Sequence, residues 1–128
     1  MINDLEVISF HDVYILGISI YTEKDHFDNI NLFLESDNFI DKYETDKVTI
    51  EFKECFKAKL LLQMWICGKD SINKMEIKEV ATNNCREFFQ MKEKGFFKEN
   101  INFNQCEITL NTSSSKIEIF AKEVRIKY

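Results

Sequence analysis

The sequence contains no proline and only three glycines, at positions 17, 68 and 95. Interdomain linkers are usually rich in proline, glycine or low-complexity sequence. Because the chain has no segment of that kind, it is predicted to form a single domain over residues 1–128. The wide separation of the glycines excludes a glycine-rich loop that would cradle a phosphate group. A chain of 128 residues is long enough to bury a core without a disulfide or a metal.

Long apolar runs and a basic leader are also missing. No apolar stretch approaches the roughly 20 residues that a membrane-spanning helix requires. The first residues include Asp4 and Glu6 where a secretory signal would carry lysine or arginine. We therefore expect a cytoplasmic protein with no membrane partner.

Metal-binding and nucleophilic residues are few. The four cysteines, Cys55, Cys67, Cys85 and Cys106, form no Cys-x-x-Cys pair, and the chain has only two histidines. Because zinc sites usually take two ligands from one short segment, neither a structural metal nor any other cofactor is expected. The cysteines are interpreted as reduced, small apolar side chains.

Charge is unevenly distributed along the chain. The net charge is −5, but residues 1–54 carry 13 acids and 4 lysines, a net of −9, whereas residues 55–128 carry 9 acids and 13 bases, a net of +4. Phosphate contacts dominate nucleic-acid affinity, so an acidic chain with only two arginines argues against nucleic acid as the partner.

Apolar and polar residues alternate in many segments, which is typical of strands with one buried face. The alternating apolar positions lie at 16–20, 30–34, 48–52, 75–77, 106–110, 117–119 and 124–128. These runs predict at least six strands and as many as eight. The connection from Thr22 to Asp28 is short and polar, which suits antiparallel neighbours, and the turn residues 111–115 predict a C-terminal hairpin.

Two segments depart from this alternation. Cys85, Phe88, Phe89 and Lys92 fall at helical spacing before Gly95, which predicts one short helix near residues 83–94. Residues 58–67 are apolar without a clear period and fit either a buried strand or a helical turn. The predicted fold class is α+β: strand-rich, mainly an antiparallel sheet, with that one short helix.

The pair His11-Asp12 is the first candidate for chemistry, since adjacent imidazole and carboxylate ligands hold the metal in one class of phosphohydrolases. Such a site needs several more histidines, and this chain has only His26. We interpret His11 and Asp12 as a structural turn between two strands. No nucleophile has a recognisable base beside it, so no catalytic residue is assigned and the protein is not expected to be an enzyme.

The segment from Glu35 to Asp46 combines five acids with aromatic and aliphatic residues. Acids that attract a basic partner, around apolar side chains that then become buried, are typical of a protein interface. The candidate partner-binding residues are Glu35, Asp37, Phe39, Asp41, Tyr43, Glu44 and Asp46. In the alternative interpretation, Phe39, Ile40 and Tyr43 only anchor the segment to the core.

The sequence also resembles a family of small bacterial proteins that open with a His-Asp strand turn, some of which are assigned as immunity proteins of polymorphic toxin systems. The resemblance covers about residues 5–80 and lies in Phe10-His11-Asp12, the alternation at 15–20 and 30–34, Val48–Phe52, and Gly68–Ile72 with Met75–Ile77. This chain has Val13 where the family usually has a small polar residue.

The resemblance implies that the protein binds and neutralises a cognate toxin domain, as in contact-dependent growth inhibition. An acidic binder is a suitable counterpart of a basic toxin. The alternative is a small accessory or structural protein, such as a homodimer joined through a strand edge or an aromatic patch. A third hypothesis is an enzyme with an unrecognised site around His11.

Overall fold

The computed structural model describes residues 12–22, 28–62, 71–81, 102–111 and 115–128. These residues form one six-stranded antiparallel sheet and one short helical segment between the second and third strands. The elements are β1 (Tyr14–Thr22), β2 (Asp28–Glu35), the 3-10 helix η1 (Asp37–Phe39), α2 (Ile40–Tyr43), β3 (Lys47–Leu61), β4 (Ile72–Ala81), β5 (Asn102–Leu110) and β6 (Lys116–Lys127).

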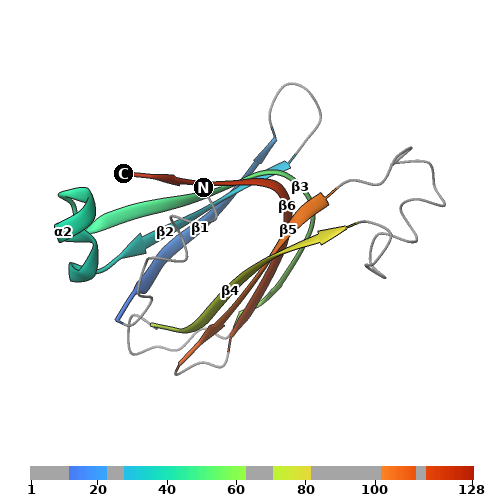
Figure 1. Cartoon of the computed structure of the whole chain (residues 1–128). Coiled ribbons are helices and arrows are strands. Elements are labelled where there is room, and N and C mark those ends of the chain that lie inside the picture. Colours follow the sequence, from blue (N-terminus) through green and yellow to red (C-terminus); the bar gives the residue numbers. More distant parts are fainter. Residues whose placement is uncertain (1–11, 23–27, 63–70, 82–101, 112–114) are drawn as a thin grey trace.

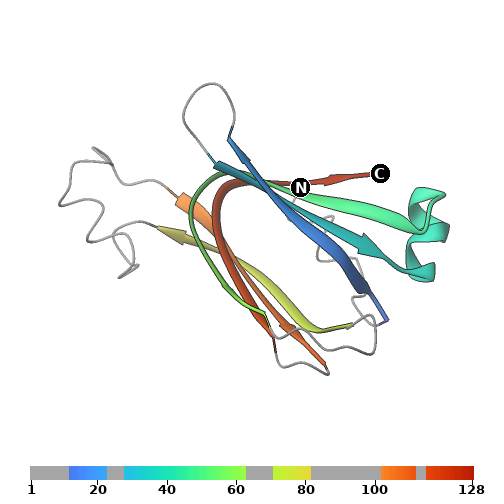
Figure 2. The ribbon, with the colours of Figure 1, turned by 180° about the vertical axis from the view of Figure 1, so that it is seen from behind.

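The strand order across the sheet is β1-β2-β3-β6-β5-β4, and every pairing is antiparallel. β3 and β6 are the longest described strands and curve together, so that the β1–β2 part of the sheet turns toward the β5–β4 part (Figures 1 and 2). The two edge strands approach each other at one end, where Tyr14 bridges Ser71 and the Ile72 backbone N–H donates to the Val13 carbonyl at 2.8 Å.

The core lies inside this curved sheet. It follows the alternation in the sequence: Val48, Ile50 and Phe52 of β3 are buried, whereas Thr49 and Glu51 between them are only partly buried. Val13 and Ile72, at the approach of the two edges, belong to the same apolar cluster. Burial of the alternating apolar face is therefore what holds the sheet in its curved form.

The antiparallel sheet is confirmed, and the chain that the structure describes is nearly all β. The predicted helix at residues 83–94 lies outside the described residues. Among the described residues, a short helix lies at Ile40–Tyr43. The C-terminal hairpin is confirmed as β5 and β6. The runs at 117–119 and 124–128 do not form separate strands, because β6 continues through Phe120 and Ala121, both fully buried.

The ambiguous segment 58–67 is resolved in part. β3 extends to Leu61, so residues 58–61 are strand, and residues 63–67 lie outside the described residues. Within the described residues, no helix has the length and apolar character needed to span a membrane.

Candidate functional site: an acidic pocket beside the short helix

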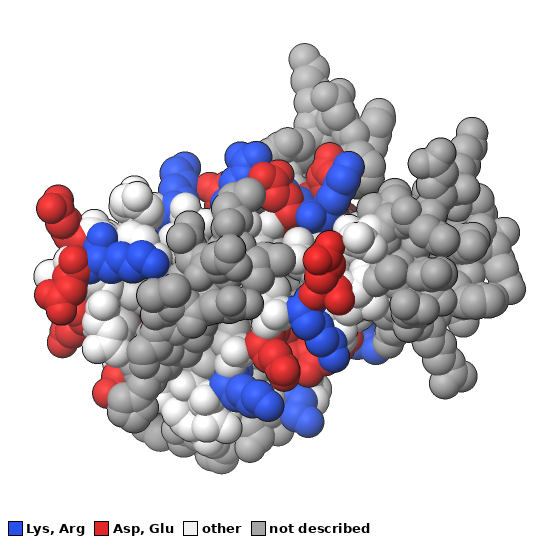
Figure 3. All heavy atoms as spheres, in the orientation of Figure 1, with Lys and Arg blue, Asp and Glu red and all other residues white. Residues whose placement is uncertain are grey.

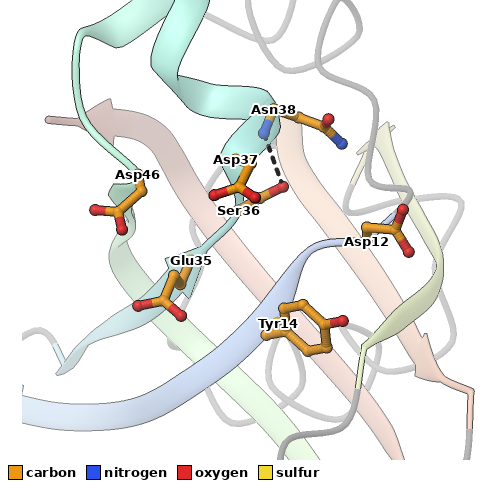
Figure 4. A pocket seen from close by; sticks show the side chains of 7 residues that line it. All are labelled: Asp12, Tyr14, Glu35, Ser36, Asp37, Asn38 and Asp46. Carbon is orange, nitrogen blue, oxygen red and sulfur yellow. Dashed lines mark hydrogen bonds between the residues drawn. The ribbon is translucent and has the colours of Figure 1, made fainter.

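One pocket of about 490 Å³ opens between the start of β1 and the segment that joins β2 to β3. Figure 4 shows its lining side chains, which are Asp12, Tyr14, Glu35, Ser36, Asp37, Asn38 and Asp46. Four of the seven are carboxylic acids, and they come from three separate parts of the chain. We call this feature the acidic pocket.

Strand pairing and a helix cap bring these residues together. Tyr14 of β1 pairs with Glu35 at the end of β2, so the residues that precede β1 face those that follow β2. The Ser36 side chain then caps η1 by accepting a hydrogen bond from the Asn38 backbone N–H at 3.2 Å. The Ser36 backbone N–H donates to the Asp46 carbonyl at 2.8 Å, which ties both ends of the helical segment together.

The charged side chains that line the acidic pocket are all acidic. Among the described residues that line it, none is basic. Lys47, just outside the lining, places its Nζ 3.4 Å from Asp46 Oδ1 and 3.5 Å from Glu35 Oε2. The Coulomb field of Asp46, followed by the hydrogen bonds to Asp46 and Glu35, raises the pKa of Lys47 above its ordinary value. The site therefore already holds one ammonium group at its rim.

The predicted partner-binding residues separate into three groups. Glu35, Asp37 and Asp46 line the acidic pocket. Asp41 and Glu44 are exposed on α2 and at its C-terminal end. Acidic side chains gather at this α2 end of the molecule in the space-filling view (Figure 3).

Phe39 and Tyr43 form the third group, and both are buried. Phe39 is 1% exposed and its ring meets the Tyr43 ring edge to face, with centroids 6.2 Å apart. Tyr43 also packs on Tyr128, at a centroid distance of 4.7 Å. Both rings thus anchor the helical segment to the core, whereas Ile40 beside them is 49% exposed.

Sequence reasoning did not assign four of the lining residues to a binding site, namely Asp12, Tyr14, Ser36 and Asn38. Asp12 is exposed in a turn with φ 57°, and His11 lies outside the described residues. A usable signal was present: a hairpin through residues 22–28 places the start of β1 opposite the end of β2. Asp12, before β1, and Asp37, after β2, therefore lie at the same end of this strand pair, where both line the acidic pocket.

Metal chemistry finds no support in the part of the chain that the structure describes. No group of three or more His, Cys, Asp or Glu side chains there could hold a metal ion. Cys55 and Cys106 are free and buried. Burial raises the pKa of the Cys55 thiol to about 12, and that of Cys106 is raised further, which makes both poor nucleophiles. Cys67 and Cys85 lie outside the described residues.

No protein-family model matches the sequence, and no curated protein matches it. The fold and the acidic pocket are therefore the basis for a functional proposal. Carboxylate oxygens in a concave site accept hydrogen bonds from ammonium and guanidinium groups, so this arrangement is suited to binding a cation on another molecule.

Proposed function

We propose that this protein is a toxin-neutralising, immunity-type protein of the bacterial cytoplasm, which binds a basic cognate toxin domain through the acidic pocket. One observation supports the proposal above all: Asp12, Glu35, Asp37 and Asp46 come from three parts of the chain and line the same concave site. A shared concave lining of this kind gives a binding surface that charge composition alone does not provide.

The chemistry of this site favours a lysine or arginine of a partner protein. A guanidinium group can donate two parallel hydrogen bonds to one carboxylate, and a concave wall of like charges concentrates the field that attracts it. Electrostatic attraction of this kind accelerates association and selects basic partners. Asp41 and Glu44 extend the negative surface along α2.

Apolar contact would come from a different residue than the buried rings. Because Phe39 and Tyr43 are buried, they support the surface from beneath. Ile40 is the exposed apolar side chain of this segment, next to Asp41. An interface centred on acids with one aliphatic contact is therefore the form of binding that we propose.

The test is co-expression with a toxin domain encoded immediately upstream of this gene. We expect this protein to rescue growth and to co-purify with the toxin domain as a stable complex. If it neither restores growth nor forms a complex, the immunity proposal is wrong.

A charge-neutralising pair of variants tests the acidic pocket itself. Asp37→Asn together with Asp46→Asn removes two pocket charges while keeping side-chain size, and we expect complex formation to weaken by at least about tenfold. The matched control, Asp28→Asn with Glu107→Gln, removes two exposed charges elsewhere in the sheet. Equal affinities of the two double variants would show that the toxin binds at another surface.

A further inference from the structure

β4 is an edge strand whose outer side pairs with no described strand beyond its first residues. β5 occupies one side of β4 along its whole length. On the other side, the described contacts with β1 end at Ser71 and Ile72. Figures 1 and 2 show β4 at the margin of the sheet from both sides. From Asn73 to Ala81, this edge can accept another strand.

The described hydrogen bonds define which backbone groups point outward. The Ile72 N–H points away from β5, toward Val13, whereas the Ser71 carbonyl accepts from Asn111 on the β5 side. Past the register shift at Asn73, Lys74, Glu76 and Lys78 pair with β5 residues 109, 107 and 105. The Leu110 backbone N–H points toward β6, where it donates to the Ser115 carbonyl. Because backbone groups alternate in direction along a strand, those of Thr109 point toward β4 and bond to Lys74. The groups that point outward are therefore those of Met75, Ile77 and Glu79.

We infer that this edge pairs with β4 of a second copy of the chain, antiparallel about a two-fold axis at Ile77. In this register Ile77 lies opposite Ile77 of the second copy, and Met75 lies opposite its Glu79, so outward backbone groups meet outward backbone groups. Glu76 lies opposite Lys78 of the second copy, and Lys78 lies opposite its Glu76. One strand thus supplies both halves of two ion pairs, as a two-fold interface requires.

Charge distinguishes this register from its neighbours. A two-fold axis at Glu76 would place Glu76 opposite itself and Lys74 opposite Lys78. An axis at Lys78 would place Lys78 opposite itself. Like charges directly opposite each other destabilise a strand pair, whereas opposite charges stabilise it. An axis at Met75 would place Glu76 opposite Lys74, but it would also place Lys78 opposite Ile72, whose outward N–H already donates to the Val13 carbonyl. The axis at Ile77 places both Glu76 and Lys78 opposite an opposite charge and leaves that contact in place.

The side chains involved are accessible to a second copy. Glu76 and Lys78 are exposed, and the Glu76 side chain has a relative exposure of 56%. Basic and acidic side chains alternate on the surface around β4 in Figure 3. Lysines on an edge strand normally repel the lysines of another copy and so prevent edge-to-edge pairing. Here each lysine of β4 has a glutamate within two residues, so a second copy can place a carboxylate opposite a lysine. This inference does not depend on the proposed function.

The experiment measures self-association by sedimentation equilibrium over a wide range of protein concentration. We expect the unaltered protein to form a dimer. Glu76→Lys and Lys78→Glu, each alone, place like charges opposite each other twice per dimer, and should raise the dimer dissociation constant at least about tenfold. A mixture of the two variants restores both pairs across the interface and should form a heterodimer as tight as the original dimer.

Two further variants test the register and the backbone pairing. Lys74→Glu changes a charge on the same face; Lys74 lies 3.6 Å from Glu76 of its own chain but opposite Val80 in the proposed register, so we expect a smaller effect on the dimer than that of Glu76→Lys. Glu79→Pro removes an outward N–H without removing a bond to β5, and should dissociate the dimer while leaving the melting temperature of the monomer nearly unchanged. A protein that stays monomeric at every concentration, or a dimer that tolerates all of these changes, would overturn the inference.

Discussion

Asn29 and Glu54 are joined by a hydrogen bond from the Glu54 backbone N–H to Asn29 Oδ1, with a distance of 2.9 Å. Glu54 has a left-handed backbone, φ 53°, and lies next to the shift in register between β3 and β6 at Cys55 and Lys57. Asn29 on β2 is 2% exposed. A buried side chain on one strand thus holds the irregular residue that lets its neighbour bend.

Replacing Asn29 with alanine should therefore destabilise the fold. We expect Asn29→Ala to lower the free energy of unfolding by about 1 to 3 kcal/mol, because the part-buried Glu54 N–H loses its acceptor. Urea denaturation measures this change. Asn102→Ala, at an exposed strand position, is the matched control and should change stability by less than about 0.5 kcal/mol. Equal stability of the two variants would show that Asn29 does not hold the bend.

The sheet could be predicted from the sequence because apolar and polar residues alternate along a strand that has one buried face. Val48, Ile50 and Phe52 show the pattern and are buried as it indicates. The pattern failed where both faces of a strand are covered. Phe120 and Ala121 are adjacent in sequence and both fully buried, which breaks the alternation and made β6 look like two strands.

The acidic pocket could be predicted only in part. The acids of residues 35–46 are visible as a cluster, but Asp12 reaches them only through the pairing of β1 with β2. That pairing contains a register shift between Ile15 and Gly17, which the local sequence pattern does not predict. For Phe39 and Tyr43 the sequence left two interpretations open, and burial, a property of the packed structure, favours their role as anchors.

Replacing Glu44 with glycine should raise the stability of the fold and weaken binding. It ends α2 in a left-handed conformation, φ 58°, where glycine is preferred because a side chain costs energy there. We expect Glu44→Gly to raise the free energy of unfolding by about 0.5 to 1 kcal/mol. It also removes one acid from the proposed interface, so binding of a basic toxin domain should weaken. Thermal denaturation and titration calorimetry measure the two effects.

The control for this change is Asp41→Gly, which removes an acid from the interior of the same helix. Because Asp41 lies in the helical segment with no left-handed backbone to relieve, this variant should lose stability as well as affinity. A destabilised Glu44→Gly protein would contradict the prediction.

The buried thiol of Cys106 should make stability fall in alkaline solution. Burial raises the pKa of Cys106, so the folded state keeps a proton that the unfolded state releases. The contribution of this thiol to the free energy of unfolding is fully present below the pKa of the unfolded thiol, near 9. Above that pH the contribution falls by about 1.4 kcal/mol per pH unit. Urea denaturation under reducing conditions from pH 8 to 10.5 should show a shallower decline for Cys106→Ala than for the unaltered protein. Parallel declines would contradict the assignment.

Lys47 should oppose partner binding, because its ammonium group already lies at the rim of the acidic pocket, within 3.4 Å of Asp46 and 3.5 Å of Glu35. If the pocket takes a basic side chain of a toxin domain, Lys47→Met should strengthen the complex by about three- to tenfold, mainly through faster association. This direction is opposite to that expected for Asp46→Asn. Lys59→Met is the matched control, since Lys59 pairs with Glu118 at 3.9 Å on another part of the sheet. Kinetic binding measurements at low and high salt should show a gain for Lys47→Met that salt reduces. The same affinity for both lysine variants would mean that the toxin domain does not approach the acidic pocket.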